Sequence, residues 1–318
     1  SNNAYTCGSI PVFYRCDPNN GWNPDLKDME SKINVANKEI VIINPKDGRV
    51  EGLIDCRGLL PKEKRTPSTD VLNGIAEYAL GTTDVGLDDF TISVIPVGSG
   101  NDWVKSVGVT RDIKQAVSLI AAGETGVQDV VRVSMLDASD LSSEPLAVSY
   151  MSNIGGVGLD ARVCEIVNSK KARGYRGKKL YVSALLYCIR HRVPTRAKVI
   201  CDGREMFAGK YLSMAFGIGK YSGGGMRQTP DAIIDDGLLD ITIIPDISIW
   251  TIAREVYKLF TGKFLTIKEI LSSRCREVYV LPEGESDSEP VEVDGEVVGR
   301  LPIKMEVLEQ QINIIRSV

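Results

Sequence analysis

The sequence predicts a two-domain protein, with an N-terminal α/β domain built on a parallel sheet and a C-terminal antiparallel β-sandwich. A chain of 318 residues is long enough for two hydrophobic cores. Apolar runs alternate with helical segments early in the chain, whereas short strand-like runs separated by turn residues dominate the later part. The expected boundaries are a segment of unassigned role at 1–37, the α/β domain at 38–125 and the β-rich domain at 126–307, with residues 308–318 returning to the first domain.

In the first domain, residues 38–43 and 91–95 are nearly continuous apolar runs, which are typical of strands covered on both faces. A helix is expected at 71–80. A second helix is expected after Thr110, which we predict as its N-cap, because the apolar residues that follow recur at helical spacing. Strands that alternate with helices favour a parallel sheet.

In the second domain, turn residues separate short runs with strand character, which favours an antiparallel sandwich. The predicted strands are 146–151, 197–201, 211–216, 240–244, 277–281, 291–293 and 303–307. Two helices are expected to interrupt them, one at 178–190 and one that begins after Ser248.

Composition excludes several classes of function. A net charge of -4 and a pI near 5.4 argue against a nucleic-acid partner. The chain has a single histidine, His191, which excludes a multi-histidine metal centre. Seven scattered cysteines without a CxxC pair indicate reduced thiols. Because the sequence shows neither a signal peptide nor an apolar run of membrane-spanning length, we expect a cytoplasmic protein.

The segment 221–240 combines a glycine turn with a cluster of acids. Its three consecutive glycines, 223–225, would let backbone N–H groups approach a ligand closely. Asp235, Asp236 and Asp240 then crowd the start of an apolar strand and call for a counter-ion, for which Mg²⁺ is the expected candidate. The alternative is a hairpin turn with a capping aspartate, since Asp-Gly is a common turn dipeptide.

Two further segments carry residues suited to phosphate chemistry. The run Gly98-Ser99-Gly100-Asn101-Asp102 lies between a predicted strand and a short helix, where backbone amides can face a phosphate. The alternative is that its polar residues only cap the helix. Further along, Asp294-Gly295-Glu296 is predicted as a hairpin turn, and Glu296 is a candidate base for a hydroxyl proton.

Basic residues flank the predicted helix at 178–190, which is rich in apolar and aromatic side chains. Lys170, Lys171, Arg173 and Arg176 precede it, and His191 and Arg192 follow it. Such a segment, 170–192, could contact an anionic membrane or hold nucleotide phosphates. The alternative is an ordinary solvated surface beside a core helix.

Taken together, these segments resemble the diacylglycerol kinase catalytic-domain superfamily, in particular the YegS-like lipid kinases and, more distantly, the sphingosine kinases. The resemblance runs from about Lys38 to the C-terminus. Its features occur in family order: Asn44-Pro45, residues 95–102, residues 153–161, Gly223-Gly-Gly-Met226 with Pro230-Asp-Ala232 and Asp236-Gly-Leu-Leu-Asp240, and Asp294-Gly-Glu296.

The resemblance implies an ATP- and Mg²⁺-dependent transfer of the γ-phosphoryl group to a lipid hydroxyl, at an active site between a nucleotide domain and a lipid domain. It also implies roles for individual residues. The nucleotide-binding residues would be Asn44, Gly98, Ser99, Gly100, Asn101, Asp102 and Asp160; the metal ligands Asp236 and the carbonyls of Ile233 and Leu238; and the catalytic residues Glu296, as base, and Asp294. A lipid substrate, peripheral membrane contact through 170–192 and a homodimer are the expected partners.

The chain departs from the family at its central signature, a Gly-Gly-Asp-Gly-Thr loop that leads into a helix ending in Asn-Gly. The helix ending is present as Asn73-Gly74, but Pro67-Ser-Thr-Asp70 stands where the loop is expected. Asp47 also occupies a position where the family has a small residue, and its carboxylate would repel phosphate. Two alternatives therefore stay open: an impaired family member that binds lipid or nucleotide as a regulator, and an NAD kinase.

Overall fold

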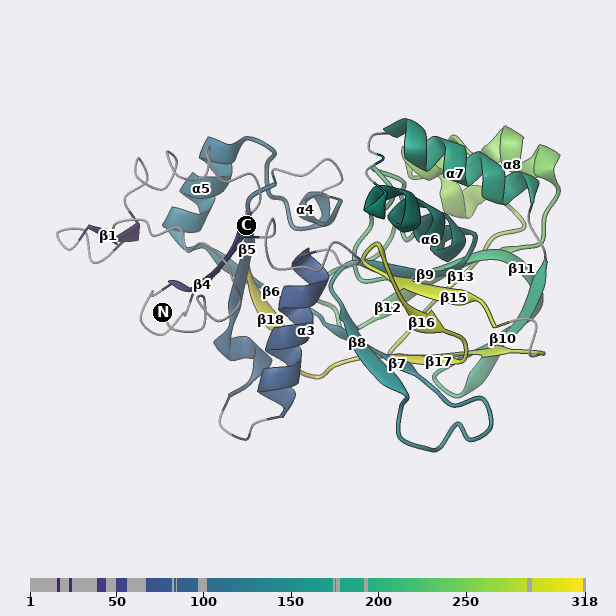
Figure 1. Cartoon of the computed structure of the whole chain (residues 1–318), viewed down its shortest axis with the longest axis horizontal. Helices are drawn as coiled ribbons and strands as arrows, with labels where there is room; N and C mark the ends of the chain where they lie inside the picture. Colours follow the sequence, from purple (N-terminus) through teal and green to yellow (C-terminus); the bar gives the residue numbers. More distant parts are fainter. Residues whose placement is uncertain are drawn as a thin grey trace. The chain divides into compact units, whose positions relative to one another are not determined.

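The computed structural model describes the backbone of residues 16–17, 23–24, 39–43 and 50–55, together with residues 67–81, 83, 85–96, 102–173, 175, 178–191, 194–284 and 288–316 (Figure 1). The chain divides into two compact units, each with its own sheet. Unit 1 comprises residues 1–128 and 310–318, and unit 2 comprises residues 129–309.

Unit 1 contains a five-stranded sheet. In order across the sheet, its strands are β4 (Val50–Asp55), β3 (Glu39–Ile43), β5 (Thr91–Val94), β18 (Ile312–Ile315) and β6 (Thr125–Gln128). A separate two-stranded sheet joins β1 (Cys16–Asp17) to β2 (Asn23–Pro24). Since β18 lies between β5 and β6, the end of the chain completes the sheet of the first unit.

The α/β class of unit 1 is confirmed, but the expected parallel pairing is confined to β18 and β5 among the strand pairs described here. Strand β3 pairs antiparallel with both β4 and β5. Only residues 44–49 join β3 to β4, and such a short connection permits a hairpin but no parallel crossover. After β4 the chain passes through a helix and continues as β5. Strand β5 runs in the same direction as β4 but lies on the other side of β3.

Among the described residues of unit 1, three helices and one 3₁₀ turn accompany this sheet: α3 (Pro67–Leu80), η2 (Leu87–Asp89), α4 (Trp103–Ser106) and α5 (Ile113–Ala122). The N-cap of α5 is Asp112, whose carboxylate accepts the backbone N–H groups of Lys114 and Gln115 at 2.8 and 3.3 Å. The prediction of Thr110 as the cap is wrong by two residues, because Thr110 instead accepts the N–H of Asp112.

Unit 2 is built on an eleven-stranded, wholly antiparallel sheet. Its strands are β7 (Val131–Met135), β8 (Ala147–Met151), β9 (Ile154–Gly158), β10 (Thr195–Cys201), β11 (Arg204–Gly217), β12 (Leu239–Pro245), β13 (Leu271–Cys275), β14 (Glu277–Pro282), β15 (Pro290–Val293), β16 (Glu296–Arg300) and β17 (Ile303–Val307). All seven predicted strands of this domain are confirmed. The glycine-rich β9 escaped prediction because glycine is depleted in strands.

One hydrophobic core unites distant parts of this sheet. The main path runs β16-β15-β9-β11-β10-β14-β17-β7-β8, and β12 and β13 branch from β11. Val293 near one end of the path and Val131 near the other belong to the same buried cluster as Met214 and Ile241. The sheet therefore folds over on itself, as the predicted β-sandwich requires.

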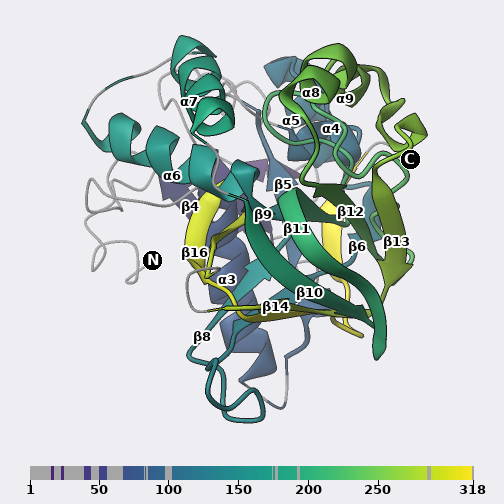
Figure 2. The same cartoon turned by 90° about the vertical axis from the view of Figure 1, so that its right-hand side faces the viewer.

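The described part of unit 2 contains four helices and a 3₁₀ turn: α6 (Leu159–Ala172), α7 (Lys178–Arg190), α8 (Ile249–Glu255), α9 (Lys258–Thr261) and η3 (Phe264–Thr266). The helices lie at one end of the unit in both views (Figures 1 and 2). The prediction of α7 is confirmed, and Ser248 caps α8 by accepting the N–H of Thr251. Within the described parts of the chain, no helix is long and apolar enough to cross a membrane.

Strand β9 can lie close to β11 only because Gly158 has no side chain. Gly158 and Gly203 both have positive φ angles, 86° and 76°. A Cβ atom on Gly158 would lie 2.8 Å from the carbonyl oxygen of Leu212, whereas one on Gly203 would meet nothing within 4 Å. Both glycines thus adopt a backbone conformation that would strain any other residue, but they differ in the space available for a side chain.

We therefore expect Gly203→Ala to lower the free energy of unfolding by about 1 kcal/mol, from backbone strain alone. Gly158→Ala should lower it by about 3 kcal/mol, because the strands must also separate. Urea unfolding of the two variants measures this difference. Equal losses in both would contradict the close approach of β9 to β11.

Candidate functional site

A tight turn between β15 and β16 presents the predicted catalytic residues. Asp294 and Gly295 both have positive φ angles, 49° and 92°, which suit a two-residue hairpin turn. The Asp-Gly pair supplies this conformation, because glycine meets no steric penalty there and aspartate tolerates it. The turn places Glu296 at the start of β16, while Glu292 lies in β15 just before it.

The carboxylate of Asp294 fastens this hairpin to the turn between β8 and β9. One oxygen accepts the N–H and the hydroxyl of Ser152 at 2.8 and 2.9 Å. The other accepts the N–H groups of Asn153 and Ile154 at 2.9 and 3.1 Å. Burial raises the pKa of Asp294 to about 6 in spite of these four donors. With both oxygens occupied, Asp294 acts as a positioning residue.

Helix α6 holds the tip of the same hairpin. The amide of Asn168 donates to a carboxylate oxygen of Glu296 at 3.0 Å and to the carbonyl of Gly295 at 3.1 Å. One turn earlier on α6, the thiol of Cys164 donates to the same carbonyl at 2.8 Å. Residues four apart lie on one face of a helix, so α6 makes hydrogen bonds to the tip from two positions on the same face. Glu296 is partly exposed and can meet a substrate.

Asp160, in the first turn of α6, ends a chain of hydrogen bonds. Its Oδ2 atom accepts the hydroxyl of Ser213 at 2.7 Å and the amide of Gln228 at 2.8 Å. Gln228 in turn accepts the hydroxyl of Ser222, which opens the predicted glycine turn. Burial raises the pKa of Asp160, against the effect of its two donors. The glycine turn is thereby linked to Asp160.

Glu292 is a buried carboxyl group beside these residues, and sequence reasoning did not select it. Only 7% of its surface is exposed, and its Oε2 atom accepts the N–H of Gly295 at 2.8 Å. Burial raises the pKa of Glu292 well above its usual value, and the nearby carboxylates of Asp160, Asp294 and Glu296 raise it further. Burial therefore favours the neutral form of Glu292 within this cluster.

Gly156 in β9 makes room for this cluster. A Cβ atom there would lie 3.2 Å from both the Cβ of Asp160 and the Oε1 of Glu292. Two acidic side chains from different elements can approach each other across β9 because this glycine has no side chain. The arrangement brings Asp160, Asp294 and Glu296, all predicted as site residues, into one cluster.

The glycine turn itself is compact. Gly223, Gly224 and Gly225 all have positive φ angles, and the N–H of Met226 bonds to the carbonyl of Ser222 at 2.9 Å. The side-chain amide of Asn153 donates to the carbonyl of Tyr221 at 2.9 Å, so the turn between β8 and β9 also supports it. The positive φ angles of the three glycines account for this tight backbone path, and the approach of a ligand to the turn stays a prediction.

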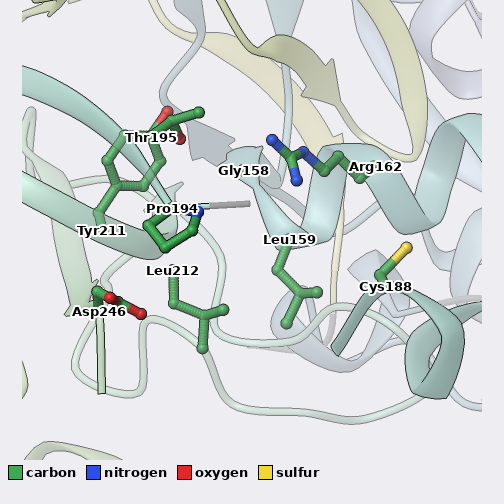
Figure 3. A pocket seen from close by; sticks show the side chains of 9 residues that line it. All are labelled: Gly158, Leu159, Arg162, Cys188, Pro194, Thr195, Tyr211, Leu212 and Asp246. Atoms are coloured by element: carbon green, nitrogen blue, oxygen red, sulfur yellow. The ribbon is translucent and has the colours of Figure 1, made fainter. Parts of the chain in front are cut away.

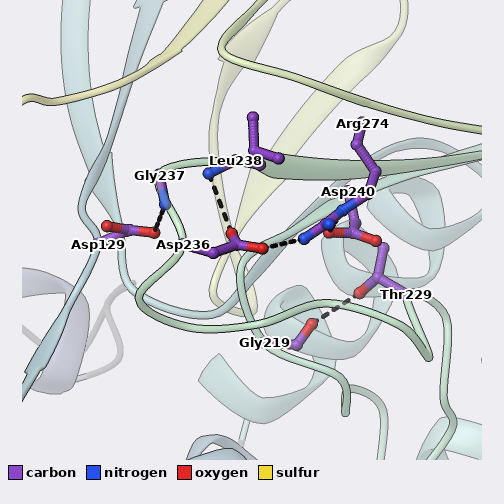
Figure 4. Close-up of polar contacts among 8 residues, drawn as sticks. All are labelled: Asp129, Gly219, Thr229, Asp236, Gly237, Leu238, Asp240 and Arg274. Carbon is purple, nitrogen blue, oxygen red and sulfur yellow. Dashed lines mark hydrogen bonds and ion pairs between the residues drawn. The ribbon is translucent and has the colours of Figure 1, made fainter.

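The acidic loop before β12 is neutralised from within the chain (Figure 4). The guanidinium group of Arg274 pairs with the carboxylate of Asp236, and its Nε atom lies 3.0 Å from a carboxylate oxygen of Asp240. The other oxygen of Asp236 accepts the N–H of Leu238 at 3.2 Å. Arg274 thus supplies the counter-ion for which the sequence interpretation invoked a metal.

Asp129, two residues before β7, holds the same loop. Its carboxylate accepts the N–H of Gly237 at 2.7 Å, and its own N–H donates to the carbonyl of Ile234 at 2.7 Å. Among the described residues, no group of three or more His, Cys, Asp or Glu side chains is arranged to hold a metal ion. The predicted set of Asp236 with two carbonyls would have only one side-chain ligand, and Mg²⁺ accepts such oxygen ligands.

Of the predicted nucleotide-binding residues in unit 1, the described part of the chain includes Asp102. Its carboxylate lies 2.6 Å from the Nζ atom of Lys105 and makes no side-chain hydrogen bond that caps α4. The side chain of Asp102 therefore does not cap α4, as the alternative interpretation would require. The other five predicted residues, Asn44, Gly98, Ser99, Gly100 and Asn101, lie outside the described residues.

A small hollow, partly open to solvent, lies beside α6 in unit 2 (Figure 3). Its lining mixes apolar and polar residues, with one cationic and one acidic side chain among them: Gly158, Leu159, Arg162, Cys188, Pro194, Thr195, Tyr211, Leu212 and Asp246. Leu159 and Leu212 in this lining directly precede Asp160 and Ser213. The hollow therefore borders the elements that carry the carboxylate cluster.

Family models match this chain in both units. The model described as the YegS C-terminal NAD kinase beta sandwich-like domain matches residues 154–316, which is half of the chain. The diacylglycerol kinase catalytic domain matches residues 68–133. A third model, of glutamine cyclotransferase, matches residues 30–83, and none of the relatives described here carries that name.

Named relatives agree with the first two models. A diacylglycerol kinase of Mycobacterium tuberculosis is 25% identical over 229 residues, which cover 72% of this chain and 70% of the relative. A Stenotrophomonas maltophilia protein named as a YegS-like lipid kinase is 27% identical over 228 residues, 70% of this chain and 68% of the relative. The diacylglycerol kinase of Bacillus subtilis is 24% identical and covers 71% and 69%.

A solved structure from Bacillus anthracis, assigned as a diacylglycerol kinase, has a similar fold. Its TM-score is 0.55 at 22% sequence identity, over 71% of this chain and 68% of that one. At this identity the likeness concerns the fold alone. With the half-chain match of the YegS model and the diacylglycerol kinase match before it, the chain belongs to the diacylglycerol kinase catalytic-domain superfamily, among its YegS-like members.

Proposed function

We propose that this protein is a lipid kinase that transfers the γ-phosphoryl group of ATP to a lipid hydroxyl. The observation that carries the proposal is the placement of Glu296: it is partly exposed and held by Asn168 in a cluster of acidic residues. Named relatives that are diacylglycerol kinases support this reaction over the phosphorylation of NAD. A diacylglycerol or a sphingoid base would offer the required hydroxyl group.

In the proposed reaction, Glu296 accepts the proton of the lipid hydroxyl as its oxygen attacks the γ-phosphorus. The bond from that phosphorus to the β,γ-bridging oxygen breaks, and ADP leaves. Phosphoryl transfer asks mainly for positioning and charge stabilisation. Asn168, Cys164 and the Asp294 clamp supply the positioning of Glu296. The predicted nucleotide residues, Gly98 to Asp102 among them, would belong to the ATP site.

The neutral state of Glu292 supports the role of Glu296. Carboxylates placed close together raise one another's pKa values, and a protonated Glu296 could not accept a proton. A proton on Glu292 removes one negative charge from the cluster. A protonated Glu292 thereby favours the ionised form of Glu296.

For Mg²⁺, we propose Asp236 and the main-chain carbonyls of Ile233 and Leu238 as ligands, with the cation replacing Arg274 as the counter-ion. These are the oxygen donors that Mg²⁺ prefers. When bound, the ion would neutralise charge on the loop before β12. Without the ion, Arg274 offsets part of this negative charge, because it pairs with both Asp236 and Asp240.

Removing the base should abolish most of the activity. We expect Glu296→Gln to lower kcat for diacylglycerol phosphorylation by about 100-fold or more, because general-base catalysis contributes that much. Transfer of labelled γ-phosphate to diacylglycerol in mixed micelles measures it, with NAD as a second acceptor. The control is Glu165→Gln, because Glu165 is a largely exposed residue of α6, the helix that carries Asn168.

Activity that survives Glu296→Gln unchanged would exclude this base. A wild-type protein without transfer to any lipid, but with measurable binding of lipid or ATP, would favour a regulatory relative. That outcome would agree with the missing glycine-aspartate loop of the family. Phosphorylation of NAD in place of lipid would overturn the proposal.

The neutral state of Glu292 predicts a pH dependence of stability. A carboxyl group whose pKa is raised on folding stabilises fully below its unfolded pKa and loses that contribution as pH rises. Glu292→Gln keeps the shape without the titration. We expect the variant to match the wild type near pH 4.5 and to exceed it in free energy of unfolding at pH 8. A difference that is independent of pH would show that Glu292 is ionised in the folded protein.

Arg274 and Mg²⁺ should compete for the acidic loop. We expect about 10 mM Mg²⁺ to raise the Tm of Arg274→Gln by roughly 3 °C more than that of the wild type, since binding at ten times Kd contributes about 1.4 kcal/mol. Adding Asp236→Asn to this variant should remove the extra rise. Equal Mg²⁺ effects in the single and double variants would exclude Asp236 as a ligand.

A further inference from the structure

Arg227 carries a positive charge that the described part of the chain does not neutralise. Its backbone N–H donates to the carbonyl of Leu259 at 2.7 Å, but no hydrogen-bond acceptor or carboxylate among the described residues meets its guanidinium group. Arg162 and Arg274, by contrast, each pair with a carboxylate. Because Arg227 is half-buried, water compensates its charge only in part. Such a guanidinium group is suited to an anion from outside the chain.

Two neighbours hold this guanidinium group in place. Its Cζ atom lies 5.3 Å from the centre of the Tyr221 ring, within the range of a cation–π contact. On another side, its Nη1 atom lies 2.6 Å from the position that a Cβ atom of Gly262 would take. Gly262 ends α9 with a φ angle of 74°. The absence of a side chain at Gly262 therefore makes room for Arg227 over the Tyr221 ring.

Tyr221 and Arg227 lie at the base of the glycine turn. The turn closes with an antiparallel bridge between Ser222 and Met226, so the residues just outside this bridge face each other. A Cβ atom on Gly224, near the tip, would meet no other atom within 4 Å. The space beside the turn is therefore open, and a bulky ligand can approach Arg227 along backbone that carries no side chains.

Hydrogen bonds connect this place to the carboxylate cluster. The residue after Arg227 is Gln228, whose amide donates to Asp160 at 2.8 Å. On the other side of the turn, the carbonyl of Tyr221 accepts the side-chain amide of Asn153 at 2.9 Å. An anion bound to Arg227 would therefore lie in the part of unit 2 that carries the candidate site.

We propose that Arg227, beside the glycine turn, binds a phosphate group. The planar guanidinium group can donate two parallel hydrogen bonds to phosphate oxygens, and the Tyr221 ring holds it in one orientation. The choice of phosphate over carboxylate rests on the proposed function, since a lipid kinase handles phosphate groups on its nucleotide and on its product. The bound group is therefore the phosphate of a phosphorylated lipid or of a nucleotide.

Isothermal titration calorimetry of the full chain without Mg²⁺ tests this site. The probes are dihexanoyl phosphatidic acid, ADP and sodium phosphate. Arg227→Gln removes the charge, whereas Gly262→Ala keeps the arginine but displaces its guanidinium group. The first matched control is Arg204→Gln, because Arg204 is exposed and likewise has no ion pair among the described residues. The second is Gly123→Ala, because Gly123 also ends a helix, at φ 70°, but has no atom within 4 Å of a Cβ position.

We expect the wild type to bind dihexanoyl phosphatidic acid, ADP or both. Arg227→Gln should weaken this binding by about tenfold or more, because hydrogen bonds between charged groups are lost. Gly262→Ala should weaken it by about fivefold, because the paired hydrogen bonds lose their geometry. Both controls should bind as the wild type does. A loss with dihexanoyl phosphatidic acid alone assigns the site to a lipid phosphate, and a loss with ADP alone assigns it to a nucleotide phosphate.

The proposal is overturned if the wild type binds neither probe, or if Arg227→Gln binds both as the wild type does. An effect on sodium phosphate alone would mark an unspecific anion site and would also overturn it. If Arg227→Gln does not fold, as its Tm would reveal, the comparison of Gly262→Ala with Gly123→Ala decides.

Kinase assays separate this outcome from that of the proposed function. A wild type without kinase activity, whose phosphate binding is weakened by Arg227→Gln, would contradict the kinase reaction and leave the phosphate site intact. An active kinase whose phosphate binding is unchanged in Arg227→Gln would overturn the phosphate site and leave the reaction intact.

Discussion

The carboxylate of Asp294 is the interaction on which the candidate site depends. It lies in a turn whose positive φ angles suit an Asp-Gly pair, and its two oxygens accept four hydrogen bonds from the β8–β9 turn. The tip of the same hairpin is held from the other side by two α6 side chains, Cys164 and Asn168. The clamp also fixes Asn153, which supports the glycine turn. One buried charge thus ties together three segments that are far apart in the sequence.

Charge neutralisation explains most of the remaining polar structure. Acidic side chains gather in two places in unit 2, and each place is balanced differently. In the loop before β12, Arg274 spans Asp236 and Asp240 as an internal cation. In the cluster around Glu296, burial favours the protonated form of Glu292, and donors from the β8–β9 turn surround the carboxylate of Asp294. The first place holds a loop, and for the second we propose proton transfer.

Much of this could be predicted from the sequence. The strands of unit 2, the ends of α7 and the Asp294-Gly295 turn follow from apolar periodicity and turn chemistry, which act over a few residues. Distant partners could not be predicted in this way. Arg274 lies more than 30 residues beyond Asp236, so its role as counter-ion depends on the pairing of β12 with β13. Glu292 is the polar residue of a Val-Glu-Val strand, a pattern typical of an exposed side chain, and its burial depends on the pairing of β15 with β9.

The position of β18 has a consequence for how the chain becomes folded. Residues 312–315 lie in the middle of the unit 1 sheet, parallel to β5 and antiparallel to β6. Until residues 312–315 are in place, β5 has no neighbour on one side and β6 does not join the sheet. The sheet of unit 1 can therefore close only after nearly all of unit 2 has been synthesised, and a chain shortened before residue 312 would expose strand edges that favour aggregation.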